Sequence, residues 1–216
     1  MVRLAAALLW LSAVPALAQA AGVAGRGAVR LLPGWHLGWD EPFQVNARAA
    51  GVPVSFPRAG GPGGFLSFSW GGTEELEVAV DGYGAWQQYA VAGGQPLDRV
   101  AYGLLLGARW IPAISPGGEW EGFLQAGAGP VLANVTGNPG AAKGEGLATG
   151  MMCGAGLSWN VAAPWAVTLE YRYLFARPHA PAPVGGSINA GGHFLLVGVA
   201  WHTAGQAPRR SVMDGF

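Results

Sequence analysis

The sequence predicts an all-β protein, an eight-stranded antiparallel up-and-down barrel that spans a membrane. Three observations carry this prediction. Apolar residues alternate with polar or small residues at a period of two along much of the chain, which indicates strands with two unlike faces. The links between these strands are short and long in turn. Six tryptophans recur at one end of the expected meander, beside the short links.

The first four expected strands cover residues 29–39, 63–70, 75–87 and 99–111. Pro33 interrupts the first strand and makes it the least regular of the eight. In the second strand, large apolar residues alternate with serines. In the third, Glu77 and Asp81 share one face and three aliphatic side chains the other. In the fourth, Arg109 lies opposite a face of Val, Tyr, Leu and Trp.

The last four expected strands cover residues 119–132, 147–160, 165–176 and 192–202. The fifth alternates from Trp120 onward, and the sixth places Cys153 on an apolar face opposite a face rich in glycine. The seventh, TLEYRYLF, sets Glu170 and Arg172 between apolar or aromatic residues at every odd position. The eighth, HFLLVGVAWH, alternates to its end. Short links at one end and longer ones at the other are typical of transmembrane barrels.

The composition requires a place for a large apolar surface. Hydrophobic residues make up 51% of the 216 residues. Charged residues make up 11%, against about 25% in an ordinary soluble domain. Acidic and basic residues are equal in number, at 12 each, so nothing in the charge balance attracts nucleic acid. The single cysteine, Cys153, cannot form an intramolecular disulfide, and we interpret it as a small apolar side chain in a strand.

The first twenty residues have the layout of a secretory signal peptide. Arg3 precedes an apolar run over residues 4–14, and small residues at 16–20 predict cleavage after Ala20 or Ala18. A transmembrane anchor is the alternative, but the run is too short to cross about 30 Å of hydrocarbon. We therefore expect a signal peptide at 1–20, a barrel at 21–203 and a short periplasmic tail at 204–216.

The tryptophans favour a membrane as the surroundings of this sheet. Six have the parity of the apolar face and lie at the short-link end: Trp70, Trp110, Trp120, Trp159, Trp165 and Trp201. A ring of indoles at one level is typical of a membrane interface, which accommodates both the apolar ring and its N–H donor. We therefore expect an aromatic belt on the periplasmic side. A soluble secreted β-sandwich is the alternative, but it would place its indoles near strand centres.

Charged residues of the opposite parity must then face the inside of the barrel. They are Arg30, Glu77, Asp81, Arg99, Arg109, Glu121, Glu170 and Arg172. An unpaired ion in that interior would cost several kcal/mol, so we expect four guanidiniums and four carboxylates to pair in one lumen network. Side chains fill the interior of a barrel with eight strands, which leaves little room for a channel.

The alternation, the unlike ends, the segment LEYRY and the closing LLVGVAWH together resemble the small outer-membrane β-barrels of the OmpA, OmpX and OmpW type. The resemblance covers about residues 27 to 203. It implies a monomeric protein of the bacterial outer membrane that contacts membrane lipid and lipopolysaccharide and is inserted by the barrel-assembly machinery. Trp201 matches one aromatic position of the family's final strand, while Thr203 stands where the family usually ends in Phe.

A catalytic alternative comes from the PagL-type lipid A deacylases, which resemble this chain in outline. They need a Ser nucleophile activated by His, in a His-x-Ser-Asn motif after the seventh strand. Phe175 and Arg177 occupy the nearest positions here, and the spacing of His179, Ser187 and His193 does not reproduce the motif. The four histidines also lack metal-ligand spacing. We therefore expect no catalytic residue, no cofactor and no metal.

Three functions stay open at this point. The first is a non-enzymatic outer-membrane barrel that serves envelope structure, surface interaction or passage of a small solute. The second is a lipid A-modifying barrel enzyme, and the third is a soluble secreted β-sandwich that binds a partner. The loops at 40–62 and 177–191 are the best candidates for surface contact, because loops carry variable binding function.

Overall fold

The computed structural model describes residues 27–38, 41–49, 51, 54, 60–73, 75–92, 94–115, 119–136, 144–162, 164–179 and 187–203. The expected signal peptide at 1–20 and the expected tail at 204–216 lie outside these residues, so both stay predictions. Among the described residues, no helix is long and apolar enough to span a bilayer.

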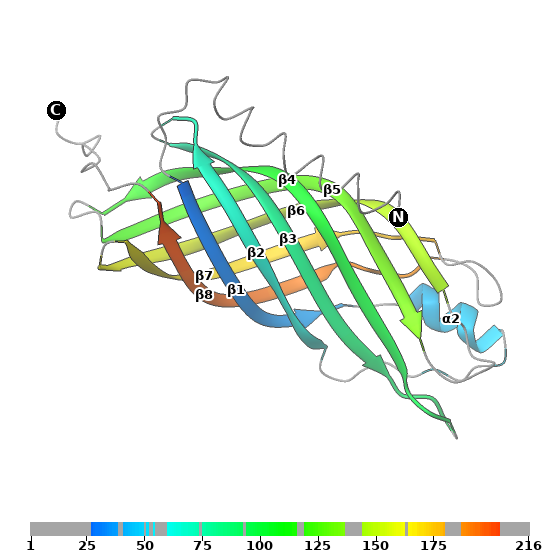
Figure 1. The fold of residues 1–216 in the computed structure, drawn as a ribbon. Coiled ribbons are helices and arrows are strands. Elements are labelled where there is room, and N and C mark those ends of the chain that lie inside the picture. The colour runs from blue at the N-terminus through cyan, green and yellow to red at the C-terminus, as the bar shows by residue number, and fades with distance from the viewer. Residues whose placement is uncertain are drawn as a thin grey trace.

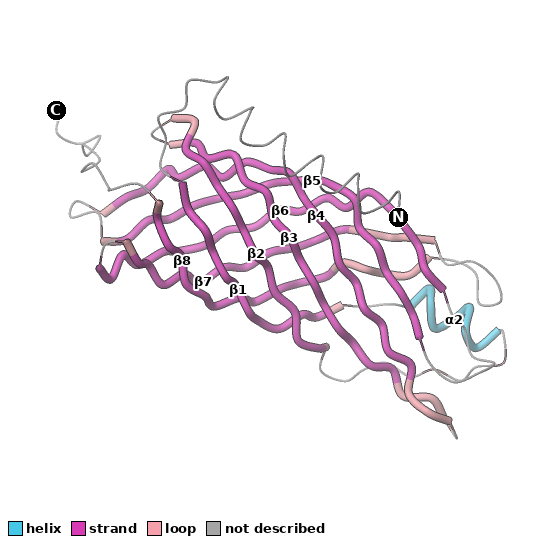
Figure 2. Tube along the Cα trace, viewed as in Figure 1, coloured by secondary structure: helices cyan, strands magenta, loops and turns pink. Residues whose placement is uncertain are grey.

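Eight strands close on themselves into one antiparallel barrel, which confirms the predicted fold (Figures 1 and 2). Each strand pairs with its neighbours in the chain, and β8 pairs with β1 to complete the wall. Closure leaves the sheet without an edge. The strands are β1 (Gly27–Leu37), β2 (Gly61–Gly71), β3 (Leu76–Tyr89), β4 (Leu97–Ile114), β5 (Trp120–Thr136), β6 (Gly144–Ala162), β7 (Trp165–Phe175) and β8 (Gly192–His202).

The barrel has two unlike ends, as the link lengths predicted. Residues 72–75, 115–119 and 163–164 connect strands at one end, which we call the short-turn end. The other four connections meet at the long-loop end, where Figure 1 also shows α2 (Glu41–Ala49). The sequence predicted only a loop at 40–62, so this helix is a difference from that prediction.

The middle strands run further toward the long-loop end than the alternation predicted. β4 begins at Leu97 rather than at residue 99, β5 ends at Thr136 rather than at 132, and β6 begins at Gly144 rather than at 147. Glycine and short side chains give the added ends of β5 and β6 little apolar signal, and β4 gains only Leu97 and Asp98 there. Backbone pairing between adjacent strands nevertheless continues through them, for example from Asn134 to Glu145.

Each strand turns one face outward and the other into the bore. β7 alternates without exception: Leu169 and Tyr171 are 51% and 47% exposed on the outer face, whereas Glu170 and Arg172 are 0% exposed inside. Cys153 of β6 lies on the outer face and is exposed. The outer face is apolar over most of the wall, as expected for a barrel whose outer face contacts the acyl chains of a membrane.

Two prolines interrupt the ladders on opposite sides of the wall. The β4–β5 register skips from Gly103 and Val131 to Leu106 and Ala128, where Pro130 offers no N–H to the neighbouring strand. The β8–β1 register skips two pairs at Pro33 in the same way. Strand β1 nevertheless continues through Pro33, so the predicted irregularity is confined to these pairs.

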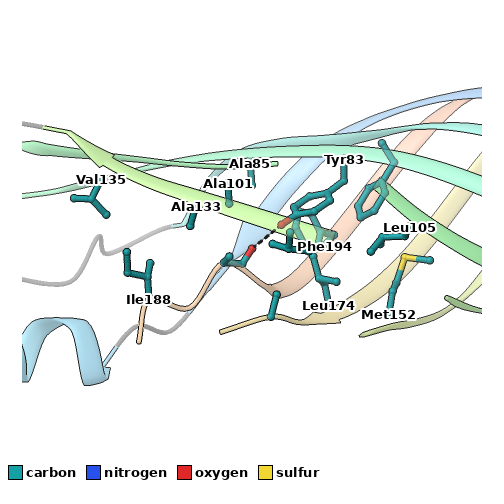
Figure 3. Packing of buried hydrophobic residues seen from close by; sticks show 14 of the residues in the cluster. Tyr83, Ala85, Ala101, Leu105, Ala133, Val135, Met152, Leu174, Ile188 and Phe194 are labelled. Carbon is teal, nitrogen blue, oxygen red and sulfur yellow. Dashed lines mark hydrogen bonds between the residues drawn. The ribbon is translucent and has the colours of Figure 1, made fainter. Parts of the chain in front are cut away.

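The bore is filled in two layers. Most of the buried charged and polar side chains occupy the half nearer the short turns, whereas Arg99, His36 and Gln87 lie toward the long loops. A cluster of buried apolar side chains occupies the half nearer the long loops, and Figure 3 shows Phe194, Tyr83, Leu105, Met152 and Leu174 in it. The apolar layer reaches the loops themselves, because Ala47 of α2 and Val54 belong to the same cluster.

Candidate functional site

All eight charged residues that the sequence assigned to the lumen are buried. Six of them form salt bridges in the half of the bore near the short turns, namely Arg30, Glu77, Asp81, Arg109, Glu170 and Arg172. These are three guanidiniums and three carboxylates, so the formal charges of the six cancel. We call these six residues the ion network.

Glu170 is the centre of the ion network. Its Oε2 accepts from Nε and Nη2 of Arg172 at 2.8 and 2.7 Å and from Nε2 of Gln125 at 3.3 Å. Its Oε1 accepts from Arg109 Nη2 at 3.5 Å and from Thr168 Oγ1 at 3.4 Å. Three strands therefore place donors around one fully buried carboxylate, which satisfies its lone pairs.

Arg172 connects opposite walls of the barrel. It leaves β7 beside Glu170 and reaches β3, where its Nη1 donates to Asp81 Oδ1 at 3.0 Å. Its guanidinium carbon also lies 4.3 Å from the ring centroid of Phe65, where the aromatic face attracts the cation. Parity predicted that this side chain faces inward, but not which strand it reaches.

Two further arginines hold the short-turn side of the network. Arg30 donates to Glu77 Oε2 at 3.1 Å and to Ser69 Oγ at 2.6 Å. The Arg109 Nη2 atom also donates to Gln125 Oε1 at 2.9 Å. The Arg109 guanidinium carbon lies 4.2 Å from the centroid of the Phe123 ring. The two arginines thus contact a serine, a glutamine and an aromatic ring in addition to carboxylates. The parity of the charged residues did not predict these uncharged partners.

Arg99 occupies a different part of the bore. It lies on β4 ten positions before Arg109, or about 33 Å along an extended strand. Its Nη1 donates to the main-chain carbonyl of Asn189 at the long-loop end. The predicted charges therefore do not form one network, because Arg99 lies near the long loops and the ion network lies near the short turns. Glu121 is buried near the short turns, on the inner face of β5.

The loop after β7 folds back into the mouth of the barrel. The N–H groups of Ile188 and Ala190 donate to the carbonyls of Pro178 and Ala176 at 2.8 and 3.0 Å. Both donor residues are fully buried within the apolar cluster, and Figure 3 places Ile188 near Val135 and Ala133. We call residues 187–191 the mouth segment.

Three side chains from the wall bind the mouth segment at successive carbonyls. Arg99 donates to Asn189, and Tyr83 Oη donates to Ala190 at 3.3 Å, the dashed line in Figure 3. His36 Nε2 lies 2.8 Å from the Gly191 carbonyl, which can only accept, so the ring nitrogen donates. Hydrogen bonding in the lumen or loops was the role expected of the histidines, but the partners of His36 and Tyr83 could not be predicted, because they are main-chain atoms of a distant loop.

The outer face carries aromatic residues at two levels. Five of the six predicted belt tryptophans are exposed and Trp70 is half-buried, and all six lie at the short-turn ends of their strands. A second level lies toward the long loops and was not predicted. It comprises Trp35, Trp86, Tyr102, Tyr171, Tyr173 and Phe175, all exposed. Two aromatic girdles that flank an apolar band are typical of transmembrane barrels.

The histidine and serine residues weighed for catalysis do not come together as a group. His179 and Ser187 face each other in an isolated bridge. His193 lies on the outer face, where its Nδ1 is 2.6 Å from the hydroxyl of Tyr171. Among the described residues, no group of three His, Cys, Asp or Glu side chains could hold a metal ion.

No protein-family model matches this chain, and no curated protein matches its sequence. Solved structures match its fold. Outer membrane protein OprG from Pseudomonas aeruginosa superposes with a TM-score of 0.55 at 10% identity, over 84% of this chain and 97% of that one. Neisserial surface protein A gives 0.51 at 16% identity, over 82% and 95%.

A third solved structure is Ail, the attachment invasion locus protein of Yersinia pestis, in complex with the heparin analogue sucrose octasulfate. It gives a TM-score of 0.51 at 11% identity, over 82% of this chain and 98% of that one. These likenesses are likenesses of fold. They confirm that the chain has the architecture of the small outer-membrane β-barrels that its sequence resembles.

Proposed function

We propose that this chain is a bacterial outer-membrane barrel that conducts no ions, anchors itself by its wall and meets partners outside the cell with its long loops. The filled bore is the observation that carries the proposal. The ion network occupies one half and the apolar cluster the other, and both contain fully buried side chains. A bore packed in this way supports no continuous file of water.

The outer face and the fold support a place in the outer membrane. Two aromatic girdles flank a band in which the exposed side chains are mostly aliphatic. Short periplasmic turns and longer extracellular loops are the rule for such barrels. The short-turn end then faces the periplasm, and α2 and the mouth segment lie outside the cell. Structural neighbours named for the outer membrane, the cell surface and attachment support surface contact as the role.

The proposed role is not enzymatic. His193 is bonded to Tyr171 on the membrane-facing surface, so its Nδ1 is engaged and is not positioned to activate a serine. His179 and Ser187 face each other, but a bridge between main chains does not by itself create a nucleophile. Mass spectra of lipid A from cells with and without the protein test this statement. A lipid A species that appears with the native chain and disappears with Ser187→Ala would establish the deacylase alternative instead.

Conductance in planar bilayers tests the closed bore. The purified protein should insert without current steps at moderate voltage, because both layers of the bore are packed. A known porin in the same bilayers is the positive control. Reproducible steps from the native protein would contradict the proposal, whereas silence together with heat-modifiable migration of the folded protein on gels would support it.

A further inference from the structure

The outer wall carries a cation beside a hollow at the second aromatic level. Arg177 follows β7 with outward parity, is exposed, and places its guanidinium carbon 5.3 Å from the centroid of the Phe175 ring. We propose that a lipid with a phosphate group and several acyl chains binds here, with the phosphate on Arg177 and one acyl chain in the hollow. This inference rests on the proposed function, which places this level in the outer leaflet, where lipid A has that chemistry.

The hollow lies on the outer face between β5 and β6. It has a volume of about 410 Å³, and Gly129, Pro130, Leu147, Ala148 and Thr149 line it. Pro130 and Thr149 pair directly across the two strands, and both are exposed. Pro130 stands where the β4–β5 register skips, and Gly129 beside it adds no side chain to the wall. The lining is apolar apart from the Thr149 hydroxyl, so it fits a stretch of hydrocarbon chain.

The chain after β7 continues alongside the part of β6 that lines the hollow. Phe175 pairs with Met151 at the end of β7. Further along, a Cβ added at Gly146 would lie 2.5 Å from the carbonyl oxygen of His179. Arg177 lies between these two contacts, as the lining residues of β6 do on the neighbouring strand. The guanidinium is therefore a neighbour of the hollow.

The charge of Arg177 is available to a ligand. Among the described residues it forms no ion pair, and the contact of its guanidinium is with the Phe175 ring, which holds the flat cation. The one acidic residue of β6 is Glu145, and four positions, or about 13 Å of extended strand, separate it from Thr149. Arginine binds phosphate oxygens through two parallel N–H donors, so a phosphate is the anion that this side chain suits.

The depth of the site fits the headgroup region of a membrane. Tyr102 of β4 pairs with Leu132 of β5, which in turn pairs with Leu147. Tyr102 and Phe175 both belong to the second aromatic level, and the hollow lies between their two rows. Aromatic side chains of this kind lie at membrane interfaces. The hydroxyl of Thr149 is then at a depth where it can donate to a phosphate oxygen.

Native mass spectrometry of the purified protein in detergent measures this binding. Lipid A should bind the native chain one to one. Arg177→Gln should weaken that binding about tenfold, through the loss of one pair of charge-assisted hydrogen bonds. Lipid A from which the phosphates have been removed should bind both proteins equally. Arg48→Gln removes another exposed arginine, on α2, and is the matched control, which should bind like the native chain.

A second variant tests the hollow. Leu147 is 65% exposed on the outer face, so Leu147→Trp fills the hollow without entering the bore. It should weaken lipid A and its dephosphorylated form alike, by roughly fourfold for each methylene group that loses its place. Leu195→Trp, at a similarly exposed outward leucine of β8, is the control and should have no effect. Heat-modifiable migration on gels shows that each variant is folded.

Equal binding of lipid A to the native chain and to Arg177→Gln would overturn the phosphate contact. Indifference to Leu147→Trp would overturn the hollow as the place of the acyl chain. Phosphatidylglycerol should bind more weakly than lipid A, and equally tight binding would overturn the choice of lipid A. These measurements use purified protein, so they do not depend on where the chain resides. Failure of the proposed function would be seen separately, as bilayer conductance or as absence from the outer membrane.

Discussion

At the scale of the residue, Glu170 decides whether the bore is stable. It is fully buried and accepts hydrogen bonds from two arginines, a glutamine and a threonine. Glu170→Gln keeps the shape but removes the charge that Arg109 and Arg172 share. Loss of one partner from a buried ion pair costs about 3–5 kcal/mol. We expect a loss of that size in the free energy of unfolding, measured by urea titration in lipid vesicles.

The matched control for this change is Arg48→Gln. Arg48 is an exposed residue in the last turn of α2, so its loss should change the free energy of unfolding by less than about 0.5 kcal/mol. If both variants unfolded at the native urea concentration, the ion network would contribute nothing and the account of the bore would be wrong.

A second residue-scale prediction concerns the membrane-facing side of β7. Leu169 and Phe175 point outward on the same strand, at 51% and 46% exposure, but Phe175 belongs to the second aromatic level, toward the long loops. Arginine on the lipid face costs about 2–4 kcal/mol near the midplane and about 0–1 kcal/mol near an interface. Leu169→Arg should therefore destabilise the vesicle-inserted protein much more than Phe175→Arg. Equal small losses in urea titrations would indicate that water surrounds the wall.

Parity in the sequence was sufficient to predict which side chains point inward, because a strand repeats every two residues and β7 does so without exception. Parity does not predict height along the bore. Arg99 and Arg109 have the same parity, yet one bonds the mouth segment and the other bonds Glu170. Ten positions along one strand separate the two residues. What the sequence did not supply was the partner of Arg99, because that partner is a main-chain carbonyl of a distant loop.

At the scale of the element, the junction between the mouth segment and β8 depends on glycine. Gly192 has φ of 141°, and a Cβ there would lie 2.7 Å from His36 Nε2. A side chain in such a backbone conformation costs about 1–3 kcal/mol. We expect Gly192→Ala to lower the free energy of unfolding by that amount and to loosen the His36 contact, seen as faster maleimide labelling of Ile188→Cys in a Cys153→Ser background.

The matched control for this variant is Gly84→Ala in the middle of β3. A Cβ at Gly84 would meet no atom within 4 Å, so this variant should be neutral or more stable by up to about 1 kcal/mol. A Gly192→Ala protein as stable as Gly84→Ala would show that the junction tolerates a side chain and that its backbone is not constrained.

The elements themselves were largely predictable, and their ends were not. Eight strands follow from alternation, even through Pro33, because closure supplies partners on both sides of β1. The unpredicted ends of β5 and β6 contain Gly, Ala and Asn, which indicate no clear face, and the two residues added at the start of β4, Leu97 and Asp98, are too few to show alternation. The helix α2 was missed because its nine residues include Pro and Asn and form no long apolar stripe. Its Ala47 belongs to the buried apolar cluster of the bore.

At the scale of the whole molecule, the two ends of the barrel should face different compartments. Val45 lies exposed on α2 at the long-loop end, and Gly72 lies exposed in the turn between β2 and β3. In a Cys153→Ser background, an impermeant maleimide should label Val45→Cys on intact cells and Gly72→Cys only after the outer membrane is permeabilised. The reverse pattern would invert the orientation that we propose.

The two layers of the bore show what a sequence conveys about a whole barrel. Charges at inward parity predicted a polar filling, since a low dielectric demands partners for each ion. The apolar layer was not predicted as a unit, because part of it comes from outside the strands: Ala47, Val54, Ala176, Ile188 and Ala190 belong to none of the eight. The mouth segment is held by side chains that donate to main-chain carbonyls. Every residue has such a carbonyl, so the sequence does not indicate which residues accept these hydrogen bonds.

The position of Cys153 gives experimenters a built-in report of insertion. The thiol points out of the wall on β6, in register with Tyr173 of β7 on the same outer face. A water-borne alkylating reagent reaches it in an unfolded polypeptide and in a barrel held in plain buffer, but is kept away once acyl chains cover that spot. The native protein, without any substitution, can therefore signal by a single mass increment whether it has entered a bilayer.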